Sequence, residues 1–183
     1  MELVDPDARF HRSYLAALDE LLASGEEHYA GLPSLPAEGD FPGVEFTRES
    51  LEDPDDFAAL VRYLIGQRNP FAARPRAYVP FTELWMAEGD EYLGRISLRH
   101  ELNALLHEWG GHIGYAVRPS ARRRGHATAA LRRMLEICGD RGIDPVLVTC
   151  DVDNRASRRT IEGAGGEYDD TREGKLRFWV PAR

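Results

Sequence analysis

The chain has 183 residues and a mass of 20.6 kDa, and we expect a single domain over residues 1–183. With 43% hydrophobic and 30% charged residues it can bury a core, and it contains no apolar run of about 18 residues, which excludes an integral membrane protein. Its two cysteines, Cys138 and Cys150, exclude a disulfide framework and lack metal-ligand spacing, so we expect both to be reduced and buried.

The net charge of −8 is unevenly distributed along the chain. Residues 1–56 hold 15 acidic residues against three arginines, whereas the rest of the chain holds 16 acidic residues against 20 basic ones. Much of the basic surplus lies between Arg122 and Arg159, where we expect an anionic ligand. The acidic first third favours either a solvated surface or a cationic partner. The opening segment has no basic stretch before an apolar run, so we expect no secretory signal and a cytoplasmic location.

The first third of the sequence predicts two amphipathic helices. Apolar residues recur at helical spacing from Phe10 to Leu22, before Ser24-Gly25 interrupts them, and again from Phe57 to Leu64. The second helix is expected to begin near Asp53 and to end before Asn69-Pro70. A loop rich in proline and glycine covers residues 31–44 between the two helices.

From Val79 onward, short β-rich runs replace the helical pattern. Residues 81–86 and 92–98 predict an antiparallel pair that turns at Glu88-Gly89-Asp90. A third strand is expected over residues 112–117. Within it, His112 is expected to pack or to form a hydrogen bond rather than to take part in chemistry.

The second half of the chain predicts a right-handed strand–helix–strand crossover. Apolar positions from Ala127 to Cys138 mark one face of a helix, and the nearly all-apolar run 145–150 predicts a strand in the middle of a sheet. Asp153-Asn154 caps a further short helix, and residues 176–180 form a last strand. The expected fold class is therefore α/β (α+β), with a mixed sheet and two N-terminal helices.

The most informative stretch is residues 119–128, PSARRRGHAT, at the junction of a strand and a helix. Three adjacent arginines at a helix N-terminus oppose the positive end of the helix dipole, at about 0.3–1 kcal/mol each when exposed, so fold stability does not explain them. Free backbone N–H groups, which Gly125 and Ala127 leave approachable, predict a polyphosphate site. A basic surface turn is the alternative. The phosphate-binding motifs of P-loop and dinucleotide-binding proteins are absent from the sequence.

The same stretch resembles the cofactor signature Q/R-x-x-G-x-G/A of the GCN5-related N-acetyltransferase (GNAT) superfamily. The signature is Arg122-x-x-Gly125-x-Ala127, and it follows a strand that ends Tyr115-Ala116-Val117-Arg118-Pro119. The order of strand, signature, helix, buried strand and Asn154-x-x-Ser157 is similar to the superfamily from about Phe81 to Val180. Residues 99–103, 110–115 and 153–157 resemble one branch of uncharacterised bacterial predicted acetyltransferases.

The resemblance implies a GNAT-like, mostly antiparallel sheet and an N-acetyltransferase that transfers an acetyl group from acetyl-CoA to a primary amine. Direct attack is expected, without a covalent enzyme intermediate and without a metal. Residues 79–180 are the expected acetyl-CoA-binding core and residues 1–75 the expected acceptor side. The acceptor, a small-molecule or protein amine, cannot be read from the sequence.

Other activities and partners are weighed against this one. A non-catalytic sensor that binds acetyl-CoA is the alternative function. A nucleic-acid partner is excluded because the net charge is −8 and no aromatic residues interleave with the arginines. Homodimers are common among proteins of this kind, and a homodimer is left open.

The resemblance also implies which residues bind the cofactor. The backbone of Tyr115, Ala116 and Val117 is expected to pair with the pantetheine arm, and the Val117 N–H to donate to the thioester oxygen. Asn154 is expected to bind the pantetheine or the incoming amine, with a plain helix cap as the alternative, and Ser157 to act similarly. The pyrophosphate is expected at the residues of the signature loop, namely Arg122, Arg123, Arg124, Gly125, His126, Ala127 and Thr128.

The acid for the departing thiolate is missing from its usual place. Many relatives carry a tyrosine seven residues after the strand-end asparagine, whereas this chain has Ile161. A thiol whose solution pKa is about 8.5 leaves without much help, and a water, Ser157 or Tyr168 is the expected substitute.

A general base is needed because an attacking ammonium must first lose a proton. Glu101 and His100, at the end of the second central strand, are the best candidates by position, followed by Asp151. Trp85 and Tyr78 are expected either to line the acceptor pocket or to pack in the core.

Overall fold

The centre of the fold is the hairpin of β4 (Phe81–Glu88) and β5 (Glu91–Arg99), which turns at Gly89. In the computed structural model, which describes residues 1–182, this hairpin belongs to a seven-stranded sheet of order β1-β4-β5-β6-β7-β9-β8. Neighbouring strands are antiparallel except for β6 and β7, which are parallel. The predicted mixed, mostly antiparallel sheet is therefore confirmed.

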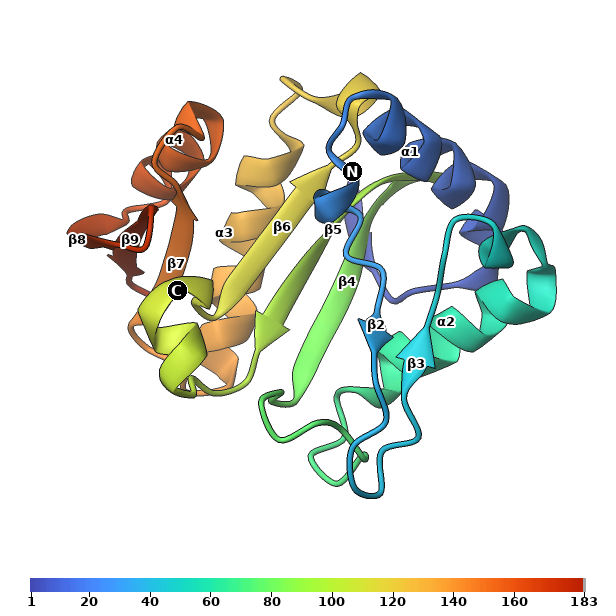
Figure 1. Ribbon diagram of the computed structural model, residues 1–183. Coiled ribbons are helices and arrows are strands. Elements are labelled where there is room, and N and C mark those ends of the chain that lie inside the picture. Colours follow the sequence, from blue (N-terminus) through green and yellow to red (C-terminus); the bar gives the residue numbers. More distant parts are fainter. Residues whose placement is uncertain (183) are drawn as a thin grey trace.

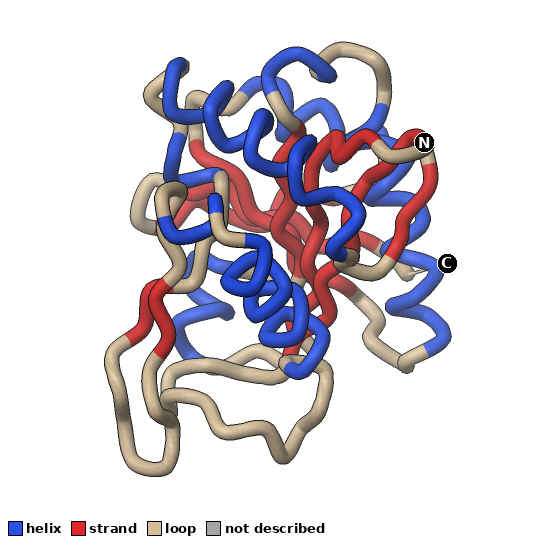
Figure 2. The backbone as a smooth tube through the Cα atoms, turned by 90° about the vertical axis from the view of Figure 1, so that its right-hand side faces the viewer, coloured by secondary structure: helices blue, strands red, loops and turns tan. Residues whose placement is uncertain are grey.

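The other elements include all those expected from the sequence, in the expected order, and some further strands. The remaining strands of the sheet are β1 (Glu2–Val4), β6 (Ile113–Val117), β7 (Val146–Asp151), β8 (Glu167–Arg172) and β9 (Lys175–Val180). The α-helices are α1 (His11–Ala23), α2 (Pro54–Gly66), α3 (His126–Asp140) and α4 (Arg155–Gly163). A separate small hairpin joins β2 (Ser34–Leu35) to β3 (Val44–Glu45), and Figure 2 shows its strands leading into long loops beyond the main sheet.

The two faces of the sheet bury two separate apolar cores. Helices α1 and α2 cover one face, and α3 and α4 cover the other (Figure 1). Trp85 is 0% exposed in the first core, where its ring lies 5.0 Å from that of Tyr14 and 5.2 Å from that of Tyr92. Of the two interpretations left open for Trp85, the structure therefore supports the core residue.

Two edge strands, the small hairpin of β2 and β3, and one helical turn were not predicted. The sequence of β8, EYDDTR, is largely polar, and β1 has only three residues. Edge strands are often short and charged because one of their sides meets solvent, so their sequences lack the alternation of a half-buried strand. Residues Leu106–Gly110 form a π-helical turn between β5 and β6. Residues 1–75 thus contribute a strand to the sheet in addition to the expected helices and loop.

Strands β6 and β7 are paired only at one end. Their register contains the single pair Ile113 and Val148. Just before it, the His112 N–H donates to the Leu147 carbonyl at 2.7 Å, and the His112 Nδ1 accepts from the Leu147 N–H at 2.9 Å. His112 therefore closes the junction between the strands, and Figure 1 shows them diverging beyond it.

The divergence leaves part of β6 without a partner on that side. The Arg99 N–H donates to the His112 carbonyl, and the Arg118 N–H donates to the Leu93 carbonyl. Because peptide groups alternate in direction along a strand, the even-numbered residues of β6 pair with β5, and Tyr115 and Val117 direct their N–H groups toward β7. No strand of the described part of the chain pairs with them there, so these N–H groups are available to a ligand.

The buried imidazole of His112 predicts a pH-dependent stability. Burial, with a smaller effect from Arg99, lowers the pKa of His112 from 6.5 to about 4. Between these values the unfolded chain binds the proton and the folded chain does not, so the free energy of unfolding should fall by up to about 3 kcal/mol as the pH decreases. His112→Asn, whose amide oxygen can still accept the Leu147 N–H, should lose this component. Urea unfolding between about pH 7 and about pH 4.5 measures it, and parallel pH profiles for the two proteins would contradict the assignment.

Candidate active site

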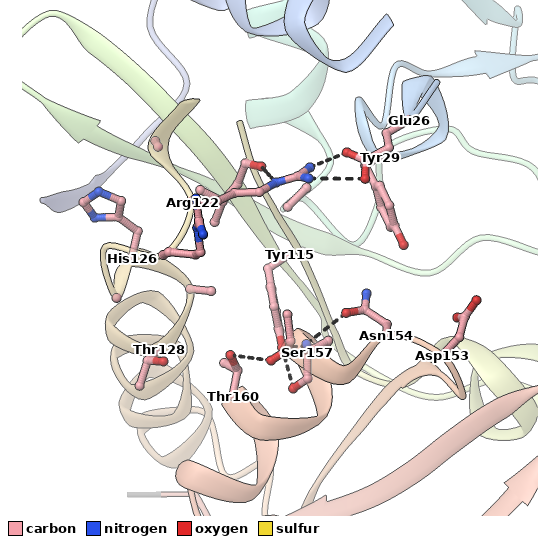
Figure 3. A pocket seen from close by; sticks show the side chains of 17 residues that line it. Glu26, Tyr29, Tyr115, Arg122, His126, Thr128, Asp153, Asn154, Ser157 and Thr160 are labelled. Atoms are coloured by element: carbon pink, nitrogen blue, oxygen red, sulfur yellow. Dashed lines mark hydrogen bonds and ion pairs between the residues drawn. The ribbon is translucent and has the colours of Figure 1, made fainter. Parts of the chain in front are cut away.

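A cavity of about 540 Å³ lies where β6 and β7 separate (Figure 3). Its walls come from the end of β6, the loop before α3 and the start of α4, and Glu26 and Tyr29 of the segment after α1 complete it. It brings together nearly all the residues predicted to bind a cofactor: Tyr115, Ala116, Val117, Arg122, Arg123, Gly125, His126, Ala127, Thr128, Asn154 and Ser157. Arg124 is exposed and does not line it.

The loop before α3 presents its backbone to this cavity. Gly125 caps α3 with φ of 83°, and Arg123 also has a positive φ of 62°. A Cβ atom built on Gly125 would meet no heavy atom within 4 Å, so the space beside it is open. The first N–H groups of a helix have no partner within the helix, and they carry the positive end of its dipole. This end of the cavity is therefore suited to an anion.

The side chains of the loop are held differently from one another. Arg122 donates from Nε to the Val117 carbonyl at 3.0 Å and forms an ion pair with Glu26. His126 is buried, its ring points away from the other labelled side chains in Figure 3, and its Nε2 has no hydrogen-bond partner in the described part of the chain. An anion that enters the cavity therefore competes with Glu26 for Arg122.

Polar groups from β6 and α4 meet at the opposite end of the cavity. The Asn154 Oδ1 accepts from the Ser157 N–H at 3.0 Å, which makes Asn154 the cap of α4. The Tyr115 hydroxyl lies 2.7 Å from the Ser157 Oγ, and burial raises the pKa of Tyr115 to about 12 (Figure 3). Ile161 is fully buried in the core, and Tyr168 is exposed and does not line the cavity. Tyr115 and Tyr29 are thus the phenols at this site.

A second cavity, of about 490 Å³, lies on the face of β4 and β5 that carries α2. Its wall is mostly apolar and aromatic and includes Tyr78, which the sequence placed either in an acceptor pocket or in the core. Its floor is polar and consists of Glu83, Arg95, Ser97 and Arg99. Arg95 Nε donates at 3.3 Å to the carbonyl of Tyr29, which lines the first cavity, so the walls of the two cavities are in contact here.

Glu83 is the carboxylate of the second cavity, and sequence reasoning missed it. It is 4% exposed, its Oε2 lies 3.3 Å from Arg95 Nη1, and its Oε1 accepts from the indole N–H of Trp85 at 3.2 Å. Burial raises the pKa of Glu83 although Arg95 opposes the shift. The sequence did contain an indication of this. Phe81, Glu83 and Trp85 are every second residue of the predicted strand and therefore share its inward face, where an acidic residue is unusual.

The two candidate bases named from the sequence lie elsewhere. His100 and Glu101 line a third cavity beside Arg74 and Arg141, and neither lines the first two cavities. His100 Nε2 forms a hydrogen bond with Thr82 Oγ1 at 2.9 Å. Burial, together with the positive charge of nearby arginines, lowers the pKa of His100. Asp151 forms an ion pair with Lys175. The structure does not bring these candidates to the cavity of the predicted cofactor residues.

Some features are absent from the described residues. Residues 1–182 contain no group of three or more His, Cys, Asp or Glu side chains that could hold a metal ion. None of their helices is long and apolar enough to cross a membrane. Cys138 and Cys150 are both free and buried, as expected, and burial raises the pKa of both thiols.

A comparison with models of known protein families identifies one family. Residues 44–167 match the acetyltransferase (GNAT) domain. Among curated proteins none matches the sequence.

Solved structures of three acetyltransferases share the fold at low sequence identity. The microcin self-immunity acetyltransferase MccE, in complex with acetyl-CoA and AMP, has a TM-score of 0.61 and 12% identity, covering 98% of this chain and 91% of its own. RimL, a ribosomal alpha-N-protein acetyltransferase in complex with coenzyme A, has a TM-score of 0.59 and 15% identity, covering 100% and 95%. Mycobacterium smegmatis RimJ, in complex with CoA-disulfide, has a TM-score of 0.58 and 18% identity, covering 94% and 78%.

The buried pair of Glu83 and Arg95 predicts a strong coupling in stability. Arg95→Met leaves the Glu83 carboxylate buried without its cation, which should lower the free energy of unfolding by about 3–5 kcal/mol at neutral pH. Arg95→Met combined with Glu83→Gln removes the unpaired charge and should recover much of that loss. Urea unfolding of the single and double variants measures the coupling. Additive effects of the two substitutions would show that the pair does not interact.

Proposed function

The chain belongs to the acetyltransferase (GNAT) family, and on that premise we propose that it transfers the acetyl group of acetyl-CoA to a primary amine by direct attack of the amine on the thioester. One observation carries the proposal. The cavity at the divergence of β6 and β7 is in wall-to-wall contact, through Tyr29 and Arg95, with a second cavity that contains a buried carboxylate. The cavity at the divergence suits the donor thioester, and the cavity with the carboxylate suits an amine. The solved relatives in complex with acetyl-CoA or coenzyme A support the same donor here.

The residues of the first cavity fit the parts of acetyl-CoA. The N–H groups of Tyr115 and Val117 have no strand partner, and they can bind the pantetheine amides as an added strand would. The Val117 N–H is the proposed donor to the thioester oxygen. The start of α3 and the arginines before it offer positive charge to the pyrophosphate. Asn154 keeps its amide N–H groups for the ligand because only its Oδ1 is used in capping α4.

We assign the general base to Glu83. The incoming amine is protonated at neutral pH, and its proton must leave before the nitrogen attacks. Glu83 lies inside the second cavity, and its raised pKa brings its basicity nearer to that task than an exposed carboxylate's. The proton passes to Glu83 directly or through a water. Glu101 and His100 are the bases that were predicted from the sequence alone. Variants of these two residues are therefore the controls for a variant of Glu83.

The acceptor and the organisation of the chain belong to the same proposal. Residues 79–180 provide most of the donor site, and the acceptor side includes residues of the first 75, such as Tyr63. The acceptor is a small-molecule or protein amine, and the expected location of the enzyme is cytoplasmic. A sensor that binds acetyl-CoA without turnover is the second candidate, because the usual tyrosine position is the buried Ile161. Thiol release from acetyl-CoA across an amine library separates the two.

The base assignment predicts a separation of binding and chemistry. Glu83→Gln should keep acetyl-CoA affinity and lower kcat by about 10²- to 10⁴-fold, the usual loss for a general base. Because a base acts when deprotonated, the wild-type rate should rise with pH through an apparent pKa above the ordinary carboxyl range, and this limb should vanish in the variant. Glu101→Gln and His100→Gln should change kcat only slightly. A larger loss in either of them would transfer the role of base to that residue.

The donor site predicts a selective loss of binding at Gly125. Gly125→Val should weaken acetyl-CoA binding strongly, because a branched Cβ fills the open space through which a phosphate approaches the backbone. Gly142→Val is a matched control, since Gly142 has a similar φ of 70° and no heavy atom within 4 Å of a built Cβ, but lies beyond the far end of α3. Calorimetric titration compares the two. Equal affinities in the two folded variants would remove this loop from the donor site.

A further inference from the structure

We propose that the acceptor is an anionic amine: a small molecule that carries a carboxylate-like group, bound by Arg99, beside a large apolar or aromatic group. This inference rests on the proposed acetyl transfer and specifies the substrate class of its second cavity. It follows from the charges on the cavity floor and from the residues at its rim.

Arg99 is a cation without a carboxylate partner. Its Nη1 donates to the carbonyls of Gly110 at 3.2 Å and Gly111 at 3.4 Å. Among the described residues no acid forms an ion pair with it, and its Nε and Nη2 have no hydrogen-bond acceptor. Burial, together with the like charge of Arg95, lowers the pKa of Arg99 to about 10, although the charge of Glu83 opposes the shift. The guanidinium is therefore held in an unfavourable electrostatic environment that an anion would relieve.

The charges on the cavity floor do not balance. Glu83 is the one carboxylate among the described lining residues, and it is paired with Arg95. The positive charge of Arg99 is therefore left over. A planar guanidinium with two free donor nitrogens matches a carboxylate or a phosphonate oxygen pair. The cavity thus has one carboxylate for the amine and one cation for an anion.

The position of Arg99 allows one small molecule to contact both groups. A Cβ built on Gly114 would lie 3.4 Å from Arg99 Nη1, so the guanidinium lies against β6 next to the strand edge of Tyr115. Arg95 lies four residues before Arg99 on β5, opposite Ala116, and faces the same cavity. An acceptor held by Arg99 is therefore beside both the proposed thioester site and Glu83.

The rim of the cavity is unusually apolar for a surface. Tyr78 is 49% exposed, Leu105 is 49% exposed and Trp109 is 41% exposed, and all three line this cavity. Trp109 belongs to the π-helical turn Leu106–Gly110, whose carbonyls are held by Thr149 Oγ1 and Arg99. Clustered exposed apolar side chains mark binding sites more often than single ones do. They would receive the apolar part of the acceptor.

The same charges disfavour a peptide N-terminus. The first carbonyl of a peptide is an uncharged amide, which would leave Arg99 without a counter-charge. A free amino acid with a large apolar side chain has the required combination of amine, carboxylate and apolar group.

The test uses two matched series of amines in a thiol-release assay with acetyl-CoA. The first is phenylalanine, phenylalaninamide and phenethylamine, and the second is leucine, leucinamide and isoamylamine. We expect kcat/KM to be at least about tenfold higher for the acid in one or both series, the order of one charge-assisted hydrogen bond. Equal values for the three amines, or a preference for the amides, would overturn the proposal, and the latter would indicate a peptide N-terminus. The phosphonate analogue of phenylalanine distinguishes a carboxylate site from a phosphonate site.

Variants of Arg99 test whether this residue is responsible for the preference for acids. Arg99→Gln should lower kcat/KM for the acids at least about tenfold more than for the matched amides and simple amines, and Arg99→Lys should restore part of that difference. An acid preference that persists in Arg99→Gln would overturn the assignment. Unchanged acetyl-CoA affinity and near-ultraviolet circular dichroism show that the variant is folded.

Binding measured without turnover separates this inference from the proposed function. Tryptophan fluorescence, with Trp109 at the rim of the cavity, reports binding of the same amines to the wild type and to Arg99→Gln. If the acids bind more tightly than the amides and simple amines, and if Arg99→Gln loses this difference, the inference is supported. That result would support it even if no amine caused thiol release, an outcome that would contradict the proposed acetyl transfer. Binding without an acid preference overturns the inference.

Discussion

The divergence of β6 and β7 is the constraint on which the site depends. These strands are parallel and are connected through α3, so the helix that crosses between them begins at the wide end of the gap. His112 holds the narrow end through two hydrogen bonds with Leu147. The unpaired edge of β6, the first turn of α3 and the cap of α4 then meet in one cavity. Each of these supplies backbone or amide groups that secondary structure leaves without partners.

Ion pairs between distant parts of the chain organise the residues around that cavity. Glu20 of α1 binds Arg118, at the end of β6, and Glu26 binds Arg122 of the signature loop. Part of the acidic excess of the first third is therefore used within the molecule, a role that differs from both the solvated surface and the cationic partner expected from the sequence. Arg118 is buried, so its pairing with Glu20 helps to fix α1 on the sheet, whereas Arg122 is more exposed and lies where a ligand would exchange with Glu26.

The other face of the sheet shows how a site departs from the rules of a core. Trp85 and Tyr92 of β4 and β5 are buried in the apolar core on this face. Glu83, Arg95 and Arg99 lie on the same face of the same two strands but line the second cavity. Burying these charges is unfavourable for stability, and the pairing of Glu83 with Arg95 offsets only part of it. Local violations of the apolar pattern of this kind are expected where function requires them. In this fold they lie beside the β6 edge, where donor and acceptor would meet.

Local patterns in the sequence were sufficient to predict the four α-helices, the central strands and the helix N-terminus that begins α3, where we propose that an anion binds. Helical and strand periodicities depend on neighbours a few residues apart, and a helix N-terminus exposes its N–H groups whatever surrounds it. The structure decided what those patterns leave open. It places Glu83, and not Glu101, in the cavity next to the one that we propose binds the donor, it places the phenol of Tyr115 in that proposed donor cavity while Ile161 is buried in the core, and it adds β1 and β8 to the sheet. These outcomes depend on which faces and edges long-range strand pairing brings together, because burial and the proximity of charges are properties of the assembled sheet and not of any one segment.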